Sequence, residues 1–342
     1  MRDIKAGTLI YKEKLQFVLD DSDCVGVLDM MKCFYDMTEN DQKEFLELHN
    51  KYLDLNSLPN SEKKWYFDCK NMAEDFARQA KKQAPGHLAP CFDSNLVLKI
   101  FCIHSTNDYG VRESGSIGIK VSRINHSCCP NSEPMKRSGG EMAIRATSKI
   151  LEGQEITINY AGTNDMRKLK ERRHGFQIYG FVCSCDLCQN EEINDDNEIY
   201  DKFQNLKKEA EEIFSNFMSL AKQDSHLEQY DKLVKAIAYQ KEMYNLAKKK
   251  IAPKLFILRH IIEKAFMQGV TGYEFASLDF SCFQKNYDKM EYFKSECEKL
   301  SMVGYQIAKM CYGREGKMTK EWKERNQDFE NWCKTFLKSR RK

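Results

Sequence analysis

The sequence predicts an α+β fold followed by a helical C-terminal region, and three observations support this class. Runs rich in β-branched and aromatic residues occur at 4–18 and again at 115–162. Between them, residues 20–105 carry apolar side chains at helical spacing. From residue 199 to residue 342 the spacing is helical throughout. We therefore expect short strands separated by a helical insert, and then an all-α domain.

The expected domain boundary follows from a change in composition. The stretch QNEEINDDNE at 189–198 is acidic and polar, and it separates the last β-like segment from the helical patterns. A chain of 342 residues has room for about two domains. We expect one domain at 1–188, a linker at 189–198 and a helical domain at 199–342.

The composition limits the class of protein and its surroundings. A hydrophobic fraction of 42% is enough to fill a core, and a net charge of +3 gives no reason to expect a nucleic-acid or membrane partner. No apolar run approaches the roughly 20 residues of a membrane span, and the start, MRDIKAGTLIYKEK, lacks the apolar stretch of a signal peptide. We expect an intracellular protein, in the nucleus or the cytoplasm. Its 14 cysteines are then free thiols or metal ligands rather than a disulfide framework.

Two helices of the insert have recognisable ends, and a third segment is ambiguous. Thr38 and Ser61 are the expected N-caps, and the dipeptide Pro85-Gly86 is expected to end the second helix. The run NLVLKIFCIH at 95–104 fits a helix with one apolar side. A buried strand fits this run almost as well.

The second β-rich region contains two alternating patterns. Apolar residues alternate at 142–146 and again at 156–160, as expected for half-buried strands. The segments 4–10 and 150–156 share a frame in which Ile, Gly and Ile recur three residues apart. This weak repeat predicts that the same strand-turn-strand arrangement occurs twice.

Two segments contain clusters of residues that are suited to chemistry. The stretch RINHSCCPN at 123–131 has no apolar residue after Ile124, so it is neither a buried strand nor the core face of a helix. The stretch YGFVCSCDLC places three cysteines in a C-x-C-x-x-C pattern.

The three cysteines are Cys183, Cys185 and Cys188. Three thiolates at this spacing suit one Zn²⁺, but a closed structural site needs a fourth ligand. The pair Cys128-Cys129 is the other dense cysteine position, and either residue can supply that ligand. The simpler alternative is a set of unconnected free thiols, which the tight spacing disfavours.

The three motifs together resemble those of SET-domain protein lysine methyltransferases. RINHSCCPN resembles the family's NHSCxPN motif, GQEITINY resembles the strand that ends in a tyrosine, and YGFVCSCDLC resembles the cysteine-rich post-SET segment. The motifs occur in the family's order and span 1–188. The helical insert at about 20–105 and the helical C-terminal region resemble most the SET-and-MYND group. The cysteine and histidine pattern of a MYND finger is absent before Asn125.

The resemblance implies a role for each matching residue. Asn125 and His126 are expected to bind the cofactor S-adenosyl-L-methionine, and Tyr160 is the expected catalytic tyrosine. Cys128, rather than Cys129, is the expected fourth ligand of a structural Zn²⁺.

The post-SET segment, expected at 175–188, carries two further aromatic residues with implied roles. Tyr179 is expected to line the substrate lysine channel, and Phe181 to contact the cofactor. Both could instead be ordinary sheet aromatics. A further cofactor contact falls on either His104 or Asn107, and the alignment does not decide between them.

The resemblance also implies a fold and a reaction. The family fold consists of small curved β-sheets in which the segment after the NHS motif is threaded under a loop, which is rare among protein folds. The expected function is methylation of a lysine on a protein substrate, with histones among the candidates. The alternative is a catalytically silent SET-fold scaffold that binds partner proteins.

One departure from the family pattern concerns the cofactor site. SET domains carry a G-x-G motif shortly before the segment that matches RDIKAG, and here that segment begins at Arg2. We therefore expect the cofactor site of this sequence to lack the glycine-rich backbone that covers one side of S-adenosylmethionine.

Overall fold

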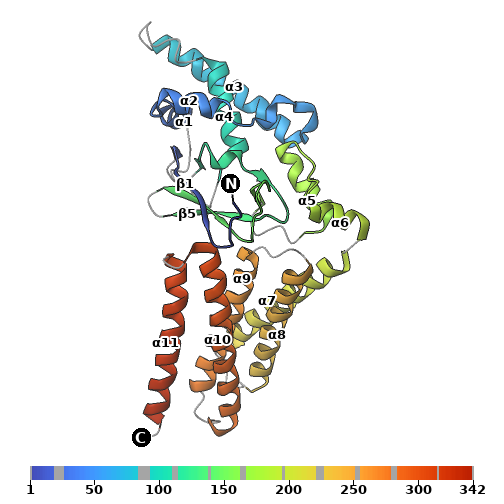
Figure 1. Ribbon diagram of the computed structural model, residues 1–342, viewed down its shortest axis with the longest axis vertical. Coiled ribbons are helices and arrows are strands. Elements are labelled where there is room, and N and C mark those ends of the chain that lie inside the picture. The colour runs from blue at the N-terminus through green and yellow to red at the C-terminus, as the bar shows by residue number, and fades with distance from the viewer. Residues whose placement is uncertain are drawn as a thin grey trace.

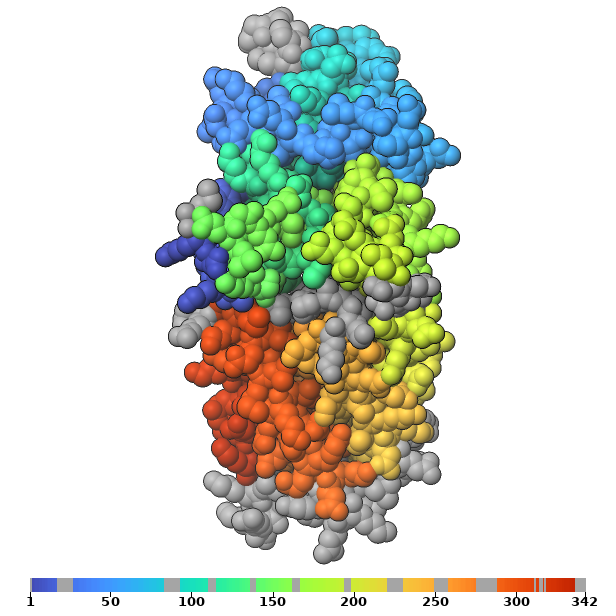
Figure 2. Space-filling model, turned by 45° about the vertical axis from the view of Figure 1, so that its right-hand side comes forward, coloured from blue at the N-terminus to red at the C-terminus, as the bar shows by residue number. Residues whose placement is uncertain are grey.

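The strands and the helices separate into different parts of the molecule, as the α+β class predicts. The computed structural model describes the following residues: 2–18, 27–83, 93–109, 115–137, 140–161, 167–194, 197–220, 227–250, 255–278, 283–313 and 316–340. Figure 1 shows three tiers along the long axis, with the helical insert above, the strands in the middle and the C-terminal helices below. The space-filling view shows the same order from another side (Figure 2).

The insert consists of helices packed around their own apolar core. Its main helices are α1 (Val27–Tyr35), α2 (Glu39–Leu46), α3 (Asn60–Gln83) and α4 (Ser94–Asn107), with short 3-10 turns η1 (Lys51–Leu53) and η2 (Leu55–Ser57) between α2 and α3. Helix α4 lies at the centre, because Val97, Ile100 and Ile103 are fully buried against α1, α2 and α3. The helical interpretation of 95–104 is therefore confirmed, and the alternative of a buried strand is wrong.

The predicted helix ends are partly confirmed. Thr38 caps α2, and its hydroxyl accepts a hydrogen bond from the backbone N–H of Asp41. Ser61 is not a cap, because α3 already begins at Asn60. The residue before it is Pro59, whose fixed φ suits a helix start and whose carbonyl accepts from the N–H of Lys63. The dipeptide Pro85-Gly86 lies outside the described residues.

Among the described residues, seven short strands form three small sheets. Their bounds are β1 (Leu9–Lys14), β2 (Phe17–Val18), β3 (Ser116–Ile117), β4 (Asn125–His126), β5 (Ser132–Arg137), β6 (Glu141–Ala146) and β7 (Thr157–Ile158). Strand β6 lies between β1 and β5, and all neighbours in this sheet are antiparallel. The alternating pattern at 142–146 is confirmed as β6, whereas that at 156–160 yields only the two residues of β7.

The repeated Ile-Gly-Ile frame reflects a direct contact between its two copies. Ile4 and Ile150 form an antiparallel bridge, with N–H to carbonyl distances of 2.8 and 2.9 Å. Gly7 and Gly153 have φ values of 80° and 82°, a left-handed conformation that suits glycine. Both copies therefore use the same glycine turn, and the first residues of the frame hold the two turns side by side.

The segment after the NHS motif is held against β7 by side-chain hydrogen bonds. Strand β4 pairs with β7 in parallel, with Asn125 opposite Thr157. The buried Asn131 accepts a hydrogen bond from the N–H of Thr157 at 2.9 Å and donates one to the carbonyl of Glu155 at 2.8 Å. Ser132 donates to the carbonyl of Thr157 at 2.9 Å. The strand pairing between β4 and β7 is only two residues long. The side-chain hydrogen bonds of Asn131 and Ser132 therefore help to hold the two motif segments together.

After β7 the described chain is mostly helical, and its longer non-helical stretches are 159–161 and 180–185. The helices are α5 (Leu169–Phe176), α6 (Asp186–Asn194), α7 (Asn197–Leu220), α8 (Leu227–Lys250), α9 (Leu255–Leu278), α10 (Phe283–Tyr312) and α11 (Lys317–Arg340). Each helix from α7 to α11 packs on the next and contributes to one large apolar core. The predicted all-α C-terminal region is confirmed. The acidic stretch 189–198 is mostly helical, because α6 extends through its first six residues and buries Glu191.

The strand tier contacts the C-terminal helices directly. Met135 of β5 belongs to the same apolar core as the helices α7 to α11, and α10 contacts β6. Within the described residues, no helix combines the length and the apolar character needed to cross a bilayer.

Candidate functional site

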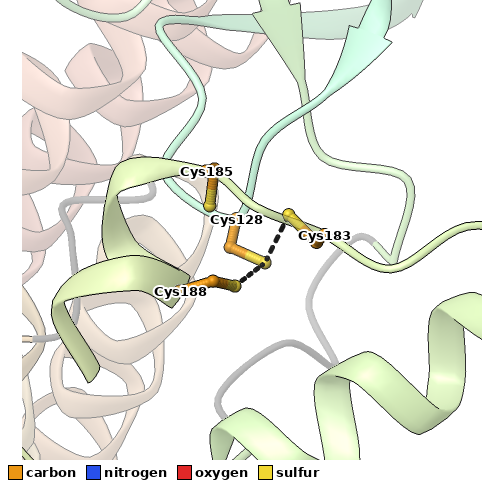
Figure 3. Close-up of side chains that lie close together, drawn as sticks. All are labelled: Cys128, Cys183, Cys185 and Cys188. Atoms are coloured by element: carbon orange, nitrogen blue, oxygen red, sulfur yellow. Dashed lines mark hydrogen bonds between the residues drawn. The ribbon is translucent and has the colours of Figure 1, made fainter. Parts of the chain in front are cut away.

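Four cysteines from two distant segments meet in one cluster. The sulfur atoms of Cys128, Cys183, Cys185 and Cys188 all lie within 4.8 Å of one another. Cys128 is central, at 3.9 Å from the sulfur of Cys183 and 3.6 Å from that of Cys188 (Figure 3). Cys129 is exposed and lies outside the cluster. Four sulfurs at such distances, three of them buried, match the donor set of a closed Zn²⁺ site.

The thiols of this cluster do not ionise independently. Hydrogen bonds from Cys128, Cys185 and Cys188 lower the pKa of Cys183 far below the ordinary thiol value. A hydrogen bond with Cys128 also lowers the pKa of Cys188, but its contacts with Cys183 and Cys185, together with its burial, outweigh this and raise it. A thiolate repels a second negative charge nearby, so each ionised cysteine disfavours ionisation of its neighbours. A bound cation would offset this repulsion and allow all four to ionise.

His126 connects the cysteine cluster to the end of β7. Its Nδ1 atom accepts a hydrogen bond from the backbone N–H of Tyr160 at 3.1 Å. The Nε2 atom lies 3.4 Å from the sulfur of Cys128. Since Nδ1 is an acceptor, a neutral imidazole carries its hydrogen on Nε2 and donates it toward that sulfur. Both ring nitrogens are thus engaged within the protein.

Aromatic rings from three segments surround His126. Its ring centroid lies 4.1 Å from Phe176, 5.2 Å from Tyr160 and 5.9 Å from Phe181. Tyr179 lies 5.6 Å from Tyr160 and 6.5 Å from Phe181. Phe176 is fully buried, whereas Tyr160, Tyr179 and Phe181 remain partly exposed. The predicted catalytic residue Tyr160, the predicted channel residue Tyr179 and the predicted cofactor residue Phe181 therefore lie together around His126. All three tyrosine and phenylalanine rings are partly exposed.

The hydroxyl of Tyr160 is fixed by the main chain of the NHS segment. It donates a hydrogen bond of 2.8 Å to the carbonyl of Ile124. Burial, together with Tyr179 and Glu155, raises the pKa of Tyr160 to about 12. The hydroxyl is therefore neutral near pH 7, and its oxygen lone pairs can accept a hydrogen bond from an amine. Such a group can position a substrate but cannot serve as a base at this pH.

The remaining predicted cofactor residues occupy different environments. The side chain of Asn125 is exposed and donates to Glu155 at 2.7 Å. On α4, the amide of Asn107 donates to the carbonyls of His49 at 2.7 Å and Ile103 at 2.8 Å.

His104, the other candidate on α4, is mostly buried, and burial lowers the pKa of its imidazole. Its ring lies against Gly115, where an added Cβ would approach Nε2 to 2.6 Å. His104 and Asn107 thus lie one turn apart, at the end of the helix that leads into the NHS segment.

One group of residues next to the aromatic cluster has no counterpart in the sequence analysis. Lys51 of η1 is buried, and its ammonium lies 2.9 Å from the carboxylate of Glu62. The same ammonium lies 5.0 Å from the ring centroid of Tyr52 and 5.9 Å from that of Tyr179. The hydroxyl of Tyr52 donates to Glu62 at 2.7 Å. This ion pair joins the insert to the post-SET aromatics, and no motif or spacing signals it.

Comparison with known proteins gives the class of the strand tier and its insert. Residues 1–161 match the family model of the SET domain. The match indicates that residues 1–161 form a SET domain. The cysteine-rich segment at 183–188 lies C-terminal to the matched region.

Curated relatives with short matching segments are methyltransferases by name. The chain is 39% identical over 70 residues to the histone-lysine N-methyltransferase ATXR2 of Arabidopsis thaliana, covering 20% of this chain and 14% of that protein. It is 38% identical over 82 residues to the histone-lysine N-methyltransferase SET5 of Vanderwaltozyma polyspora, covering 22% and 16%. A longer match, 27% identical over 160 residues and covering 41% and 31%, links it to human histone-lysine N-methyltransferase SMYD1. The chain thus matches less than a third of the length of each of these relatives.

Proposed function

We propose that this chain transfers a methyl group from S-adenosylmethionine to a lysine side chain of a protein. The observation that carries the proposal is the Tyr160 hydroxyl, which is fixed by the carbonyl of Ile124 and lies among the rings of His126, Tyr179 and Phe181. The names of the three relatives support the same reaction and make core histones the first substrates to test. A nuclear or cytoplasmic location is part of the same proposal.

The residues of the site suit the cofactor. In the proposed arrangement Asn125, the main chain of His126 and the ring of Phe181 hold S-adenosylmethionine, and Tyr179 lines the channel for the substrate lysine. Support comes from the exposed amide of Asn125 and the partly exposed faces of Phe181 and Tyr179. His104 and Asn107 remain alternatives for one further contact.

The reaction requires alignment more than acid-base catalysis. When bound, S-adenosylmethionine supplies a methyl group on a positively charged sulfur. In-line transfer to a neutral lysine nitrogen would form a nitrogen-carbon bond as the sulfur-carbon bond breaks, and the sulfur would keep the electron pair. The methylated ammonium then gives one proton to water. The Tyr160 oxygen would accept a hydrogen bond from the amine and so hold it in line with the methyl carbon.

The neutral amine can form without a dedicated base. A free lysine has a pKa of about 10.4, so it is mostly protonated at pH 7. An aromatic channel and a neighbouring sulfonium charge both disfavour the ammonium form. The aromatic residues of the site would therefore favour deprotonation as well as orientation.

The proposed zinc has a structural role. Cys128, Cys183, Cys185 and Cys188 would fill all four positions of a tetrahedral Zn²⁺, which leaves none for a substrate. When bound, the metal would neutralise the thiolates and join the NHS segment to the post-SET segment. It would thereby keep Phe181, two residues before Cys183, next to His126.

The test is a calorimetric titration of the full chain with S-adenosylmethionine, followed by a methylation assay on core histones. We expect saturable cofactor binding, and methyl transfer that Tyr160→Phe slows about a hundredfold. Cofactor binding without transfer to any histone would leave the reaction but exclude histones, and other lysine-containing proteins would then be assayed. Absence of binding would overturn the proposal and favour the catalytically silent scaffold.

A further inference from the structure

Next to the cysteine cluster lies an arginine with no contact to water. Arg172 of α5 is fully buried, and its guanidinium N–H groups point to four partners. It donates to the carbonyl of Arg167 at 2.7 Å, the hydroxyl oxygen of Tyr200 at 3.1 Å, the carboxylate of Glu191 at 2.6 Å and the sulfur of Cys188 at 3.7 Å. Burial of a charged guanidinium costs free energy unless the group is paired and hydrogen-bonded. One of the partners that offset this cost is Cys188, a member of the cysteine cluster.

Arg172 and its three side-chain partners lie on three consecutive helices, α5, α6 and α7. Cys188 and Glu191 lie on α6, and Tyr200 lies in the first turn of α7. The hydroxyl of Tyr200 also donates to Glu191, so the three side chains form a closed buried network. Tyr200 belongs to the apolar core of the C-terminal helices. The network therefore joins the cysteine cluster to the C-terminal helical region.

The charge of the cluster explains why an N–H donor is placed at a sulfur. A Zn²⁺ ion with four thiolate ligands carries a net charge of −2, and burial makes that charge costly. N–H groups directed at the thiolates offset part of this cost, and such outer contacts also orient the ligands. Two side chains offer such N–H groups: Arg172 directs Nη2 at Cys188, and His126 directs Nε2 at Cys128. Glu191 balances the charge of Arg172 itself.

We propose that Arg172 supports the metal site by donating a hydrogen bond to the thiolate of Cys188, and that it couples metal binding to the packing of α7 against the post-SET segment. The proposal rests on the proposed zinc site but not on the methyl-transfer reaction. With metal bound, the thiolate of Cys188 is a strong acceptor that holds the guanidinium in place. The guanidinium in turn holds Glu191 and Tyr200, and so the start of α7.

The adjacent residue provides a matched control. Arg173 lies on the same helix and carries the same charge, but its contacts are the carbonyl of Cys183 at 3.4 Å and the carboxylate of Glu192. Both of these acceptors are oxygen atoms, so Arg173 feels the charge of the nearby thiols but donates to an oxygen where Arg172 donates to a sulfur. Loss of a positive charge from α5 affects both variants, whereas loss of the N–H to a thiolate affects only the variant at Arg172.

The first test measures metal affinity of the full chain by competition with a chromogenic zinc chelator. We expect Arg172→Met to weaken Zn²⁺ binding by about 10-fold to 100-fold, and Arg173→Met to change it by less than about threefold. Because Arg172→Met strands the buried carboxylate of Glu191, the double variant Arg172→Met, Glu191→Met keeps the region apolar and foldable. The double variant should bind Zn²⁺ as weakly as the single one. Wild-type affinity in the double variant would overturn the proposal.

The second test measures hydrogen exchange along α7 with and without the chelator. In the wild type, metal removal should increase exchange at residues 197–206 as well as in the post-SET segment. In Tyr200→Phe the change at 197–206 should be smaller, because the hydroxyl link to Glu191 and Arg172 is lost. Unchanged exchange at 197–206 upon metal removal would overturn the coupling. A wild-type protein that binds no Zn²⁺ at all would overturn the zinc site, and with it this proposal, but not the methyl-transfer proposal.

Discussion

The backbone N–H of Tyr160 donates a 3.1 Å hydrogen bond to Nδ1 of His126, whose other ring nitrogen faces the sulfur of Cys128. One imidazole thus connects the cysteine cluster, the NHS segment and the tyrosine that follows β7. A displacement of Cys128 is therefore transmitted to Tyr160 through a single ring. The proposed metal site and the proposed reaction centre are therefore linked through His126.

The first prediction concerns the hydroxyl of Tyr160. Tyr160→Phe should lower methyl-transfer turnover about a hundredfold, because misplacement of the reacting groups costs rate on this scale, equivalent to about 2.7 kcal/mol in the barrier. Cofactor affinity by calorimetry should change by less than about threefold. Tyr11→Phe, on the exposed side of β1, is the matched control and should be silent. Equal losses of turnover and of cofactor affinity in Tyr160→Phe would contradict the positioning role.

A second prediction separates the metal ligands from their neighbour. Cys185→Ser should remove most of the bound zinc, because a hydroxyl replaces one of four thiolates in a closed site. Cys129→Ser alters an exposed cysteine adjacent to Cys128 and should keep one zinc per chain. Elemental analysis of both purified variants decides the matter. Full metal content in Cys185→Ser would refute the four-cysteine site.

A third prediction distinguishes two asparagines of the same motif. Asn131→Ala should destabilise the fold by about 2 kcal/mol, because it removes the buried amide that pairs with the N–H of Thr157 and the carbonyl of Glu155. Asn125→Ala removes an exposed contact to Glu155 and should leave stability nearly unchanged while weakening cofactor binding. Chemical denaturation measures the stabilities and calorimetry measures the affinities. Loss of stability in Asn125→Ala would show that its role is structural.

A fourth prediction concerns the buried ion pair of the insert. Lys51→Met should destabilise the protein by about 2 kcal/mol, since it leaves the partly buried Glu62 without its cation. It should also lower turnover, because Lys51 lies over the ring of Tyr179. Zinc content should not change. The double variant Lys51→Met, Glu62→Gln should recover much of the stability, and a double variant less stable than Lys51→Met would contradict this explanation.

The sequence specified the motif residues better than the contacts around them. The C-x-C-x-x-C spacing and the NHSCxPN resemblance together identified four cysteines whose sulfurs meet, and they separated Cys128 from the exposed Cys129. Close spacing works because neighbouring residues on one short turn reach a common point. Cys128 is 55 residues away from Cys183, so cysteine density alone left Cys128 and Cys129 as alternatives, and the family motif was needed to choose between them.

Contacts that depend on tertiary packing left no such pattern. Lys51 and Glu62 are ordinary charged residues in the sequence, and burial alone makes their pairing significant. Arg172 and Arg173 are consecutive arginines on different sides of α5. The side chain of Arg172 is buried, whereas that of Arg173 is partly exposed. The helix start at Asn60 instead of Ser61 is a smaller case, in which Pro59 outweighed the capping preference of serine.

The last prediction concerns pH. Burial raises the pKa of Tyr160 to about 12, above its ordinary value of about 10. A raised pKa favours the neutral hydroxyl, so Tyr160 should remain protonated throughout pH 7 to 10. The substrate lysine must lose a proton before it attacks, and below its pKa the neutral fraction rises up to tenfold for each pH unit.

The single-turnover rate should therefore rise with pH from 7 and then level off, with no decline below about pH 10 that is due to Tyr160. Rapid-quench measurement with cofactor and a lysine peptide at saturation gives this profile, and preincubation at each pH followed by assay at pH 8 controls for unfolding. Tyr160→Phe should give a lower curve of the same shape. A decline above pH 9 in the wild type that is absent from Tyr160→Phe would show that the phenol ionises in this range and would contradict its assignment as a neutral positioning group.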